Sequence, residues 1–157
     1  MSDAKLEITD EDIRFFEVAL QEAKKCENVE TAFNVGCVIV DALTNKVLTT
    51  GYSREIEGNT HAEENALNKL HGSRPRIKLY TTMIPCTKRL SGNKTCAERI
   101  VEYGNVETVY FGTPEPENFV VNDTCVGFLE KHEIRVVQIV GFQNDSLEAN
   151  RHLLKKG

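Results

Sequence analysis

The chain of 157 residues has 40% hydrophobic and 27% charged residues and a formal net charge of −5 at pH 7. This length is sufficient for one domain with a buried core, and the composition excludes a globally disordered chain. The acidic net charge argues against a nucleic-acid-binding surface, because such surfaces neutralise phosphates with a stripe of basic residues. One short basic cluster consists of Lys88, Arg89 and Lys94.

Neither membrane insertion nor secretion is expected. The sequence has no run of about 18 or more apolar residues, the length that a membrane-spanning helix requires. Its acidic N-terminal segment, MSDAKLEITDED, differs from the basic and apolar pattern of a signal peptide. We therefore expect a cytoplasmic protein with reduced thiols, and its five cysteines, an odd number, fit that compartment better than a disulfide framework.

The first predicted elements are a helix and a β-hairpin. Residues 9–26 have helical periodicity, with Thr9 and Asp12 at the spacing of an N-terminal capping box. The apolar stripe of this helix comprises Ile13, Phe16, Leu20 and Ala23. Two apolar segments at 33–40 and 46–52 predict adjacent strands, which must be antiparallel because the turn between them is short.

Helices and strands alternate in the rest of the chain. A helix is predicted at 61–71, and the segment 96–104 is predicted as a helix that ends at Gly104. The remaining predictions are strands at 76–82, 107–112 and 134–140, an irregular loop at 113–118, and helices at 123–132 and 145–155. This order predicts an α/β fold, with a single domain over residues 1–157 built as a three-layer α/β/α sandwich. Helices are expected on both faces of a mixed five-stranded sheet.

The segment Asn59-Thr60-His61-Ala62-Glu63 lies at the start of a predicted helix. His61 and Glu63 can place an imidazole and a carboxylate in one pocket. A structural interpretation competes with this one, because Thr60 and Glu63 also have the spacing of a capping box. A carboxylate that caps a helix is poorly placed for catalysis, so this segment alone leaves both interpretations open.

A second segment, YTTMIPCTKRLSGNKTC at 80–96, adds two cysteines. Cys86 follows a predicted strand, and nine residues separate it from Cys96, which begins a helix that Thr95 and Glu98 can cap. One histidine and two cysteines leave the fourth position of a zinc ion open, as in catalytic rather than structural sites. The other cysteines fall within predicted elements and are interpreted as core residues; they are Cys26, Cys37 and Cys125.

The order H-A-E, then P-C, then a second cysteine resembles the cytidine deaminase-like superfamily of zinc deaminases. The resemblance implies that His61, Cys86 and Cys96 bind Zn2+, which acidifies a water that attacks an amidine-like ring carbon. It also implies that Glu63 is not a ligand but carries protons from the water to the ring nitrogen and the leaving amine.

The nine residues between the cysteines, 87–95, distinguish this chain from nucleic-acid and nucleoside deaminases, whose spacing is usually much shorter. A long insert resembles the deaminases of riboflavin biosynthesis, and the segments 51–67 and 79–96 resemble the fungal form. That form removes the exocyclic 2-amino group of 2,5-diamino-6-ribitylamino-4(3H)-pyrimidinone 5′-phosphate. The resemblance is clear over residues 30–105. Ile84 departs from it, since related motifs usually have Glu before Pro-Cys, and this departure bears on substrate preference rather than on zinc binding.

The insert supplies candidate substrate contacts. Arg89 and Lys94 provide positive charge, and Ser91 and Asn93 provide a hydroxyl and an amide. This set suits a terminal phosphate and a polyol chain. The alternative is a solvated basic loop.

Three further candidate contacts lie outside the insert. Asn34 resembles the ligand-facing asparagine of the superfamily, the alternative being a turn residue before a strand. Arg54 is expected either to reach the substrate or to pair with a nearby carboxylate. Asn59 belongs to the segment that contains the expected zinc ligand.

Other functions share part of this pattern. A cytosine, guanine or nucleoside deaminase would have the same zinc residues and differ only in the insert. The acidic charge argues against a tRNA-editing subunit, and the intact Glu63 argues against a structural zinc module or an inactive partner subunit. By analogy with the superfamily, the partners expected are a small phosphorylated pyrimidine and a second copy of the chain in a homodimer.

Overall fold

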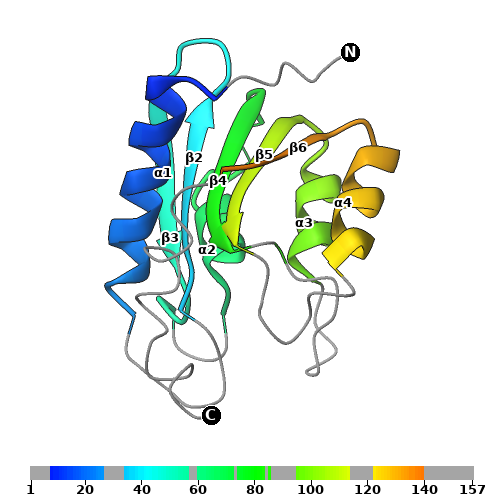
Figure 1. The fold of residues 1–157 in the computed structure, drawn as a ribbon. Coiled ribbons are helices and arrows are strands. Elements are labelled where there is room, and N and C mark those ends of the chain that lie inside the picture. The colour runs from blue at the N-terminus through cyan, green and yellow to red at the C-terminus, as the bar shows by residue number, and fades with distance from the viewer. Residues whose placement is uncertain are drawn as a thin grey trace.

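The computed structural model describes residues 8–26, 34–56, 60–72, 74–83, 85, 95–113 and 122–139. Within these residues, one mixed sheet of five strands has the order β3-β2-β4-β5-β6 (Figure 1). The strands are β2 (Gly36–Asp41), β3 (Val47–Tyr52), β4 (Ile77–Met83), β5 (Val106–Thr113) and β6 (Arg135–Gln138). The helices are α1 (Asp10–Ala23), α2 (Ala62–Asn68), α3 (Cys96–Tyr103) and α4 (Asn122–Lys131).

The sheet contains both strand orientations. Strand β2 is antiparallel to both of its neighbours, β3 and β4, whereas β4, β5 and β6 are parallel. The predicted antiparallel hairpin and mixed sheet are therefore confirmed. Because β2 runs opposite to β3 and β4, its first residues lie beside the last residues of those strands, so that Gly36 pairs with Tyr52 and Cys37 pairs with Thr81.

Helices cover both faces of the sheet, which confirms the predicted three-layer architecture (Figure 1). Helix α1 packs on one face, with a core of Phe16, Ala19, Leu20, Val38, Val40, Tyr80, Tyr110, Val137 and Ile139. Helices α2, α3 and α4 pack on the other face, whose core includes Cys37, Ile39, Ala62, Ala66, Ile77, Leu79, Ala97, Ile100, Val109, Cys125 and Leu129. Successive side chains of β2 and β4 alternate between the two cores, as the pleat requires.

Local capping signals define where helices begin. The Asp12 N–H donates to Thr9 Oγ1 (3.1 Å) and the Thr9 N–H donates to Asp12 Oδ2 (3.0 Å), which is the predicted capping box of α1. Thr95 and Glu98 form the same arrangement at α3. Helix α3 ends before Gly104, whose φ of 80° is the left-handed conformation that favours glycine.

Several predicted boundaries need correction. The strand predicted at 33–40 begins at Gly36, and the strand predicted at 134–140 spans Arg135–Gln138. Helix α1 ends at Ala23 rather than at residue 26. Helix α2 ends at Asn68 rather than at 71, and His71 and Gly72 beyond it adopt positive φ, which does not continue a helix. Thr113 belongs to β5 rather than to an irregular loop, since it pairs with Met83 of β4. The rest of the predicted loop to residue 118 and the predicted helix at 145–155 lie outside the described residues.

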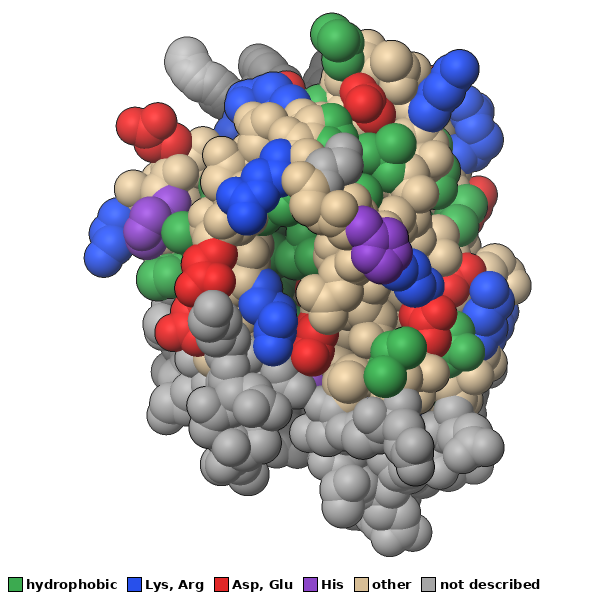
Figure 2. Space-filling model, turned by 180° about the vertical axis from the view of Figure 1, so that it is seen from behind, with side chains coloured by type: hydrophobic (Ala, Val, Ile, Leu, Met, Phe, Trp, Pro, Cys, Tyr) green, Lys and Arg blue, Asp and Glu red, His purple; other side chains and the backbone are tan. Residues whose placement is uncertain are grey.

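The charge on the surface and the length of the helices bear on two of the predictions. Basic and acidic side chains are interspersed over the face drawn in Figure 2, and no continuous basic stripe crosses the described side chains there. In the part of the chain that the structure describes, no helix combines the length and apolar character needed to span a membrane.

Candidate active site

Two of the three predicted zinc ligands lie side by side where helices α2 and α3 begin. His61 is the N-cap of α2 and Cys96 is the first residue of α3. The His61 Nδ1 and Cys96 Sγ atoms are 3.3 Å apart, and the Cys96 side chain is fully buried. Helix starts suit a thiolate, because the unpaired N–H groups and the helix dipole stabilise negative charge.

This pair of donor atoms fits a zinc ion. Zinc binds a histidine nitrogen at about 2.0 Å and a thiolate at about 2.3 Å, so two such donors of a tetrahedral site lie about 3.5 Å apart. The observed 3.3 Å between Nδ1 and Sγ is close to this separation. Cys86 lies outside the described residues, and among the described residues no group of three histidine, cysteine or acidic side chains is placed to hold a metal. The chain reaches Cys86 directly after the buried Pro85, beyond the end of β4.

A neighbouring glutamate, rather than Glu63, caps the start of α2. The His61 N–H donates to Glu64 Oε1 (3.1 Å), so the competing prediction of a capping box between Thr60 and Glu63 is wrong. The Thr60 hydroxyl instead donates to the carbonyl of Ile56 (2.9 Å). Glu64 also forms an ion pair with Arg99 of α3 (3.4 Å), which links the two helices that carry His61 and Cys96.

Glu63 is directed into the protein. Its side chain is only 3% exposed, and Glu63 Oε2 accepts a hydrogen bond from Thr81 Oγ1 of β4 (2.9 Å). Neither the contact of Glu63 with Thr81 nor the cap at Glu64 was among the features predicted from the sequence. Two signals were present: Glu64 lies three residues after the N-cap histidine, and Thr81 is a polar residue at an inward-facing position of an apolar strand.

The interpretation of the other cysteines as core residues holds for two of them. Cys37 and Cys125 are buried in the core beside α2, α3 and α4. Burial, followed by the charge of nearby Glu63, raises the pKa of the Cys37 thiol well above its ordinary value, so this thiol stays neutral. Cys26 is not a core residue, because it lies beyond the end of α1 and is partly exposed.

Asn34 and Arg54 contact each other where β2 begins and β3 ends, near the segment that leads into His61. Asn34 is 1% exposed and precedes β2, and its Oδ1 accepts a hydrogen bond from Arg54 Nη2. The Arg54 N–H donates to the Thr60 carbonyl (2.7 Å), directly before His61. The carboxylate beside Arg54 in sequence, Glu55, pairs instead with Lys69 (2.7 Å). The predicted candidates Asn34 and Arg54 are thus brought together.

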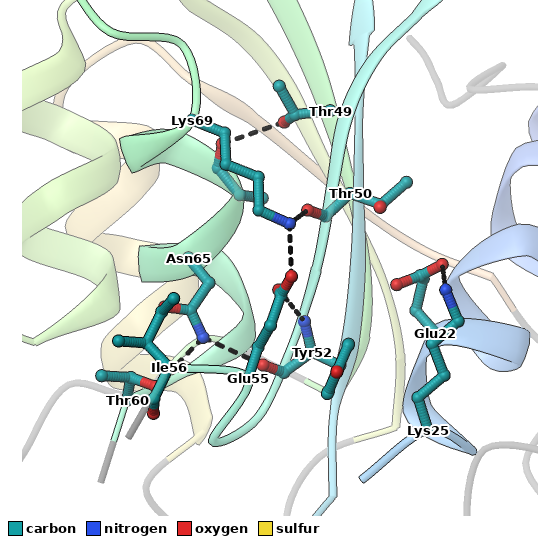
Figure 3. Close-up of polar contacts among 11 residues, drawn as sticks. Glu22, Lys25, Thr49, Thr50, Tyr52, Glu55, Ile56, Thr60, Asn65 and Lys69 are labelled. Atoms are coloured by element: carbon teal, nitrogen blue, oxygen red, sulfur yellow. Dashed lines mark hydrogen bonds and ion pairs between the residues drawn. The ribbon is translucent and has the colours of Figure 1, made fainter. Parts of the chain in front are cut away.

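A polar network ties α2 to β3 and to the turn that follows it (Figure 3). Asn65 Nδ2 donates to the carbonyl of Tyr52 (3.0 Å) and to Thr60 Oγ1 (3.1 Å). Lys69 Nζ donates to the Thr50 carbonyl (2.6 Å) and to Glu55 (2.7 Å). The Asn65 bonds hold the first half of α2, which carries Glu63, against the end of β3, and the Lys69 bonds hold its C-terminal end.

A glycine allows α2 to lie close to β3. A Cβ atom on Gly51 would be 2.5 Å from the Ala62 carbonyl oxygen and 2.7 Å from the Ala66 nitrogen. Any larger residue would push the start of α2 away from the sheet.

The other predicted site residues lie outside the described residues. They are Asn59, Cys86, Arg89, Ser91, Asn93 and Lys94. Ile84, which departs from the related motif, also lies there.

The profile of the cytidine and deoxycytidylate deaminase zinc-binding region matches residues 9–113, and the chain belongs to this family. The metal of the site is therefore Zn2+, in agreement with the separation of the His61 and Cys96 donor atoms.

Individual relatives share a more specific description. The chain is 46% identical over 136 residues to a diaminohydroxyphosphoribosylamino-pyrimidine deaminase of Schizosaccharomyces pombe, covering 82% of this chain and 32% of that protein. It thus spans about a third of the length of that relative. A protein of the same name from Buchnera aphidicola is 30% identical, covering 78% of this chain and 79% of the relative.

A solved structure shares the fold. The Aspergillus oryzae Rib2 deaminase in complex with DARIPP has a TM-score of 0.77 and 27% sequence identity, covering 89% of this chain and 90% of that one. The TM-score of 0.77 shows that this chain and the Aspergillus oryzae Rib2 deaminase have the same fold.

Proposed function

We propose that the chain is a single-domain, zinc-dependent deaminase of riboflavin biosynthesis. Its proposed substrate is 2,5-diamino-6-ribitylamino-4(3H)-pyrimidinone 5′-phosphate, from which water displaces the 2-amino group as ammonia. The observation that carries the proposal is the pairing of His61 Nδ1 with Cys96 Sγ beside a buried glutamate, Glu63. The printed names of the relatives and the DARIPP complex of the Aspergillus oryzae protein support the choice of substrate.

The proposed zinc ligands are His61, Cys86 and Cys96. When bound, Zn2+ would acidify a water in the fourth position. Glu63 would take one proton from that water and give it to the ring nitrogen. It would then take the second proton of the same water from the hydroxyl now bonded to the ring carbon and give it to the departing amine, whose bond to that carbon breaks. The net reaction consumes one water and releases one ammonia, so the proton balance closes on Glu63 without any other acid.

The protein around Glu63 supports this role. Burial excludes bulk water from the carboxylate, and the Thr81 hydroxyl holds one of its oxygens at 2.9 Å. Because Glu64 provides the helix cap, the Glu63 carboxylate is not required for capping. Of the two adjacent glutamates in α2, Glu64 therefore caps the helix and Glu63 remains available for proton transfer.

Substrate contacts are proposed for two groups of residues. Asn34 and Arg54 form one group, in which the guanidinium fixes the carboxamide oxygen and turns the Asn34 Nδ2 donor away from Arg54. Asn59 lies in the segment between Arg54 and His61 and is proposed beside them. The second group comprises the insert residues Arg89, Ser91, Asn93 and Lys94, which we assign to the phosphate and the ribityl hydroxyls.

The function is tested by measuring zinc content and ammonia release from the phosphorylated ribityl substrate, its dephosphorylated analogue, cytosine, guanine and cytidine. We expect about one zinc per chain, as three protein ligands imply, and rapid turnover of the phosphorylated substrate alone. Turnover of a free base or nucleoside instead would identify a different pyrimidine or purine deaminase. Absence of zinc would overturn the assignment altogether.

The insert is tested separately with Arg89→Ala and Lys94→Ala. A charge-assisted contact to phosphate contributes about 1.5–3 kcal/mol, so each change should lower kcat/KM about tenfold to hundredfold for the phosphorylated substrate. The dephosphorylated analogue should be unaffected by either change. Equal behaviour of both variants and the unmodified protein on the two substrates would identify the insert as a solvated loop.

We further propose that the protein is a cytoplasmic homodimer, by analogy with its superfamily. Sedimentation equilibrium tests the dimer, and fractionation of the source cells tests the location. A monomer, or a membrane-associated pool, would contradict the respective proposal.

A further inference from the structure

We propose that Thr81 is a positioning residue for Glu63. The Thr81 hydroxyl fixes the orientation of the Glu63 carboxylate and stays hydrogen-bonded to it while Glu63 transfers protons. The inference rests on the deaminase function proposed above. It concerns the hydroxyl of Thr81 in β4, which donates to the Glu63 carboxylate of α2.

Thr81 is held rigidly. It is fully buried in β4, the central strand of the sheet, and pairs with Cys37 of β2 on one side and Phe111 of β5 on the other. On the same face of β4, Ile77 and Leu79 belong to the apolar core. Burying a hydroxyl among these apolar side chains costs free energy unless it is hydrogen-bonded, and Thr81 Oγ1 lies within hydrogen-bond distance of Glu63 Oε2 and of the Met83 carbonyl oxygen.

The contact distinguishes the two oxygens of the carboxylate. Thr81 Oγ1 lies 2.9 Å from Glu63 Oε2, which prevents free rotation of the carboxyl group. The other oxygen, Oε1, is therefore held in a single direction. Since proton transfer requires the donor and acceptor within hydrogen-bond reach, an orienting bond of this kind acts on turnover rather than on substrate binding.

The hydroxyl has a second acceptor, which lets it follow the proton. Thr81 Oγ1 also lies 3.0 Å from the carbonyl oxygen of Met83, a group that can only accept. A hydroxyl has one hydrogen to donate and two lone pairs. When Glu63 is a carboxylate, Thr81 donates to Oε2. When a proton resides on Oε2 during the cycle, that O–H donates to Thr81 Oγ1, whose own hydrogen turns to the Met83 carbonyl. Neither group loses its bond in either arrangement.

Two substitutions separate the hydroxyl from the shape of the side chain. Thr81→Val keeps the branched shape and removes the hydroxyl, whereas Thr81→Ser keeps the hydroxyl. A matched control is Thr108→Val: Thr108 is fully buried in the adjacent strand β5, and among the described residues its hydroxyl has no hydrogen-bond partner. Each variant is assayed for kcat, KM, zinc content and melting temperature.

We expect Thr81→Val to lower kcat about tenfold to hundredfold, the usual effect of losing a residue that orients a catalytic or metal-binding group. KM and zinc content should stay at the wild-type values, Thr81→Ser should restore most of kcat, and Thr108→Val should match the wild type. A crystal structure of the zinc-loaded Thr81→Val variant should show the Glu63 carboxyl rotated from its wild-type orientation.

Several outcomes would overturn the proposal. These are wild-type kcat in Thr81→Val, an equal loss in the serine and valine variants, a loss equalled by Thr108→Val, or an unrotated Glu63 in the crystal structure. A failure of the deaminase function looks different, because the wild-type protein itself would then release no ammonia from any ring substrate.

Discussion

Each face of the sheet buries a hydrogen bond from a hydroxyl to a carboxylate. The two hydroxyls belong to consecutive residues of β4, Tyr80 and Thr81. On the α1 face, Tyr80 Oη donates to Asp12 Oδ1 (2.6 Å). On the α2 face, Thr81 Oγ1 donates to Glu63 Oε2 (2.9 Å). The two carboxylates are equally buried, with 4% and 3% of their side chains exposed.

The surroundings of the two carboxylates indicate a structural role for Asp12 and a chemical role for Glu63. Both oxygens of Asp12 accept structural bonds, since Oδ2 caps α1 at Thr9 and Oδ1 accepts from Tyr80, whose ring stacks on Tyr110 at 4.4 Å. Glu63 lies two residues from His61, at the helix start where the His61 and Cys96 side chains meet. A buried hydroxyl–carboxylate pair therefore does not indicate function by itself; the histidine–cysteine pair near Glu63 distinguishes it from Asp12.

The largest effect is expected from Glu63→Gln, compared with Asp12→Asn on the opposite face. Glutamine has nearly the same shape but cannot carry a proton between the water and the amine, so kcat should fall about 10²–10⁴-fold while zinc is retained. Asp12→Asn should leave kcat unchanged and lower only the melting temperature. Turnover assays with parallel zinc analysis measure both. Near-wild-type turnover of Glu63→Gln would remove the functional distinction between the two faces.

A smaller effect is expected where glycines let each helix approach the sheet. A Cβ atom on Gly51 would clash with α2, and one on Gly36 would lie 1.9 Å from the Ala19 carbonyl oxygen of α1. Overpacking of this kind costs about 1–3 kcal/mol, so both alanine variants should unfold at lower denaturant concentration. Only Gly51→Ala should also lose zinc affinity, because α2 carries His61. Equal zinc affinity in the two variants would show that α2 can shift without moving the site.

Tyr80→Phe removes the hydroxyl from the α1 face and leaves the Asp12 carboxylate with one bond fewer. Leaving a buried acceptor without its donor costs about 1–3 kcal/mol in the free energy of unfolding. The rate of deamination should not change, in contrast to Thr81→Val. Urea denaturation and turnover assays on the two variants measure this, and a loss of kcat in Tyr80→Phe would contradict the division of roles.

The smallest effect is a pH dependence that belongs to the α1 face. Burial, and then the charge of Asp12, raise the pKa of Tyr110 to about 12. In the unfolded chain a tyrosine ionises near pH 10. Above that pH the folded state holds more protons than the unfolded state, so the free energy of unfolding falls as pH rises from about 10 to about 12. Tyr110→Phe should show a shallower decline in urea denaturation series over this range. An identical slope for the variant and the wild type would exclude this contribution.

The sequence alone determined those features whose interactions join residues close together in the chain. The capping boxes of α1 and α3 each join residues three apart, and Gly104 ends α3 through its own backbone conformation. The alternation of strands and helices likewise follows from local hydrophobic periodicity, which is why the three-layer sandwich was predicted. The proposed zinc ligands could be predicted because the order H-A-E, P-C and a second cysteine is itself a sequence pattern, and His61 and Cys96 were expected at helix starts, which have local signals.

The tertiary structure alone decided which polar groups meet. Thr81 and Glu63 are 18 residues apart, and Asn34 and Arg54 are 20 apart. Both pairings depend on the register of β2, β3 and β4 and on how closely Gly51 lets α2 approach. The choice between Glu63 and Glu64 as the cap of α2 was of the same kind. Two adjacent glutamates have similar local propensities, and the fold distinguishes them: Glu63 meets the buried Thr81 hydroxyl of β4, whereas Glu64 caps the helix and pairs with Arg99 of α3.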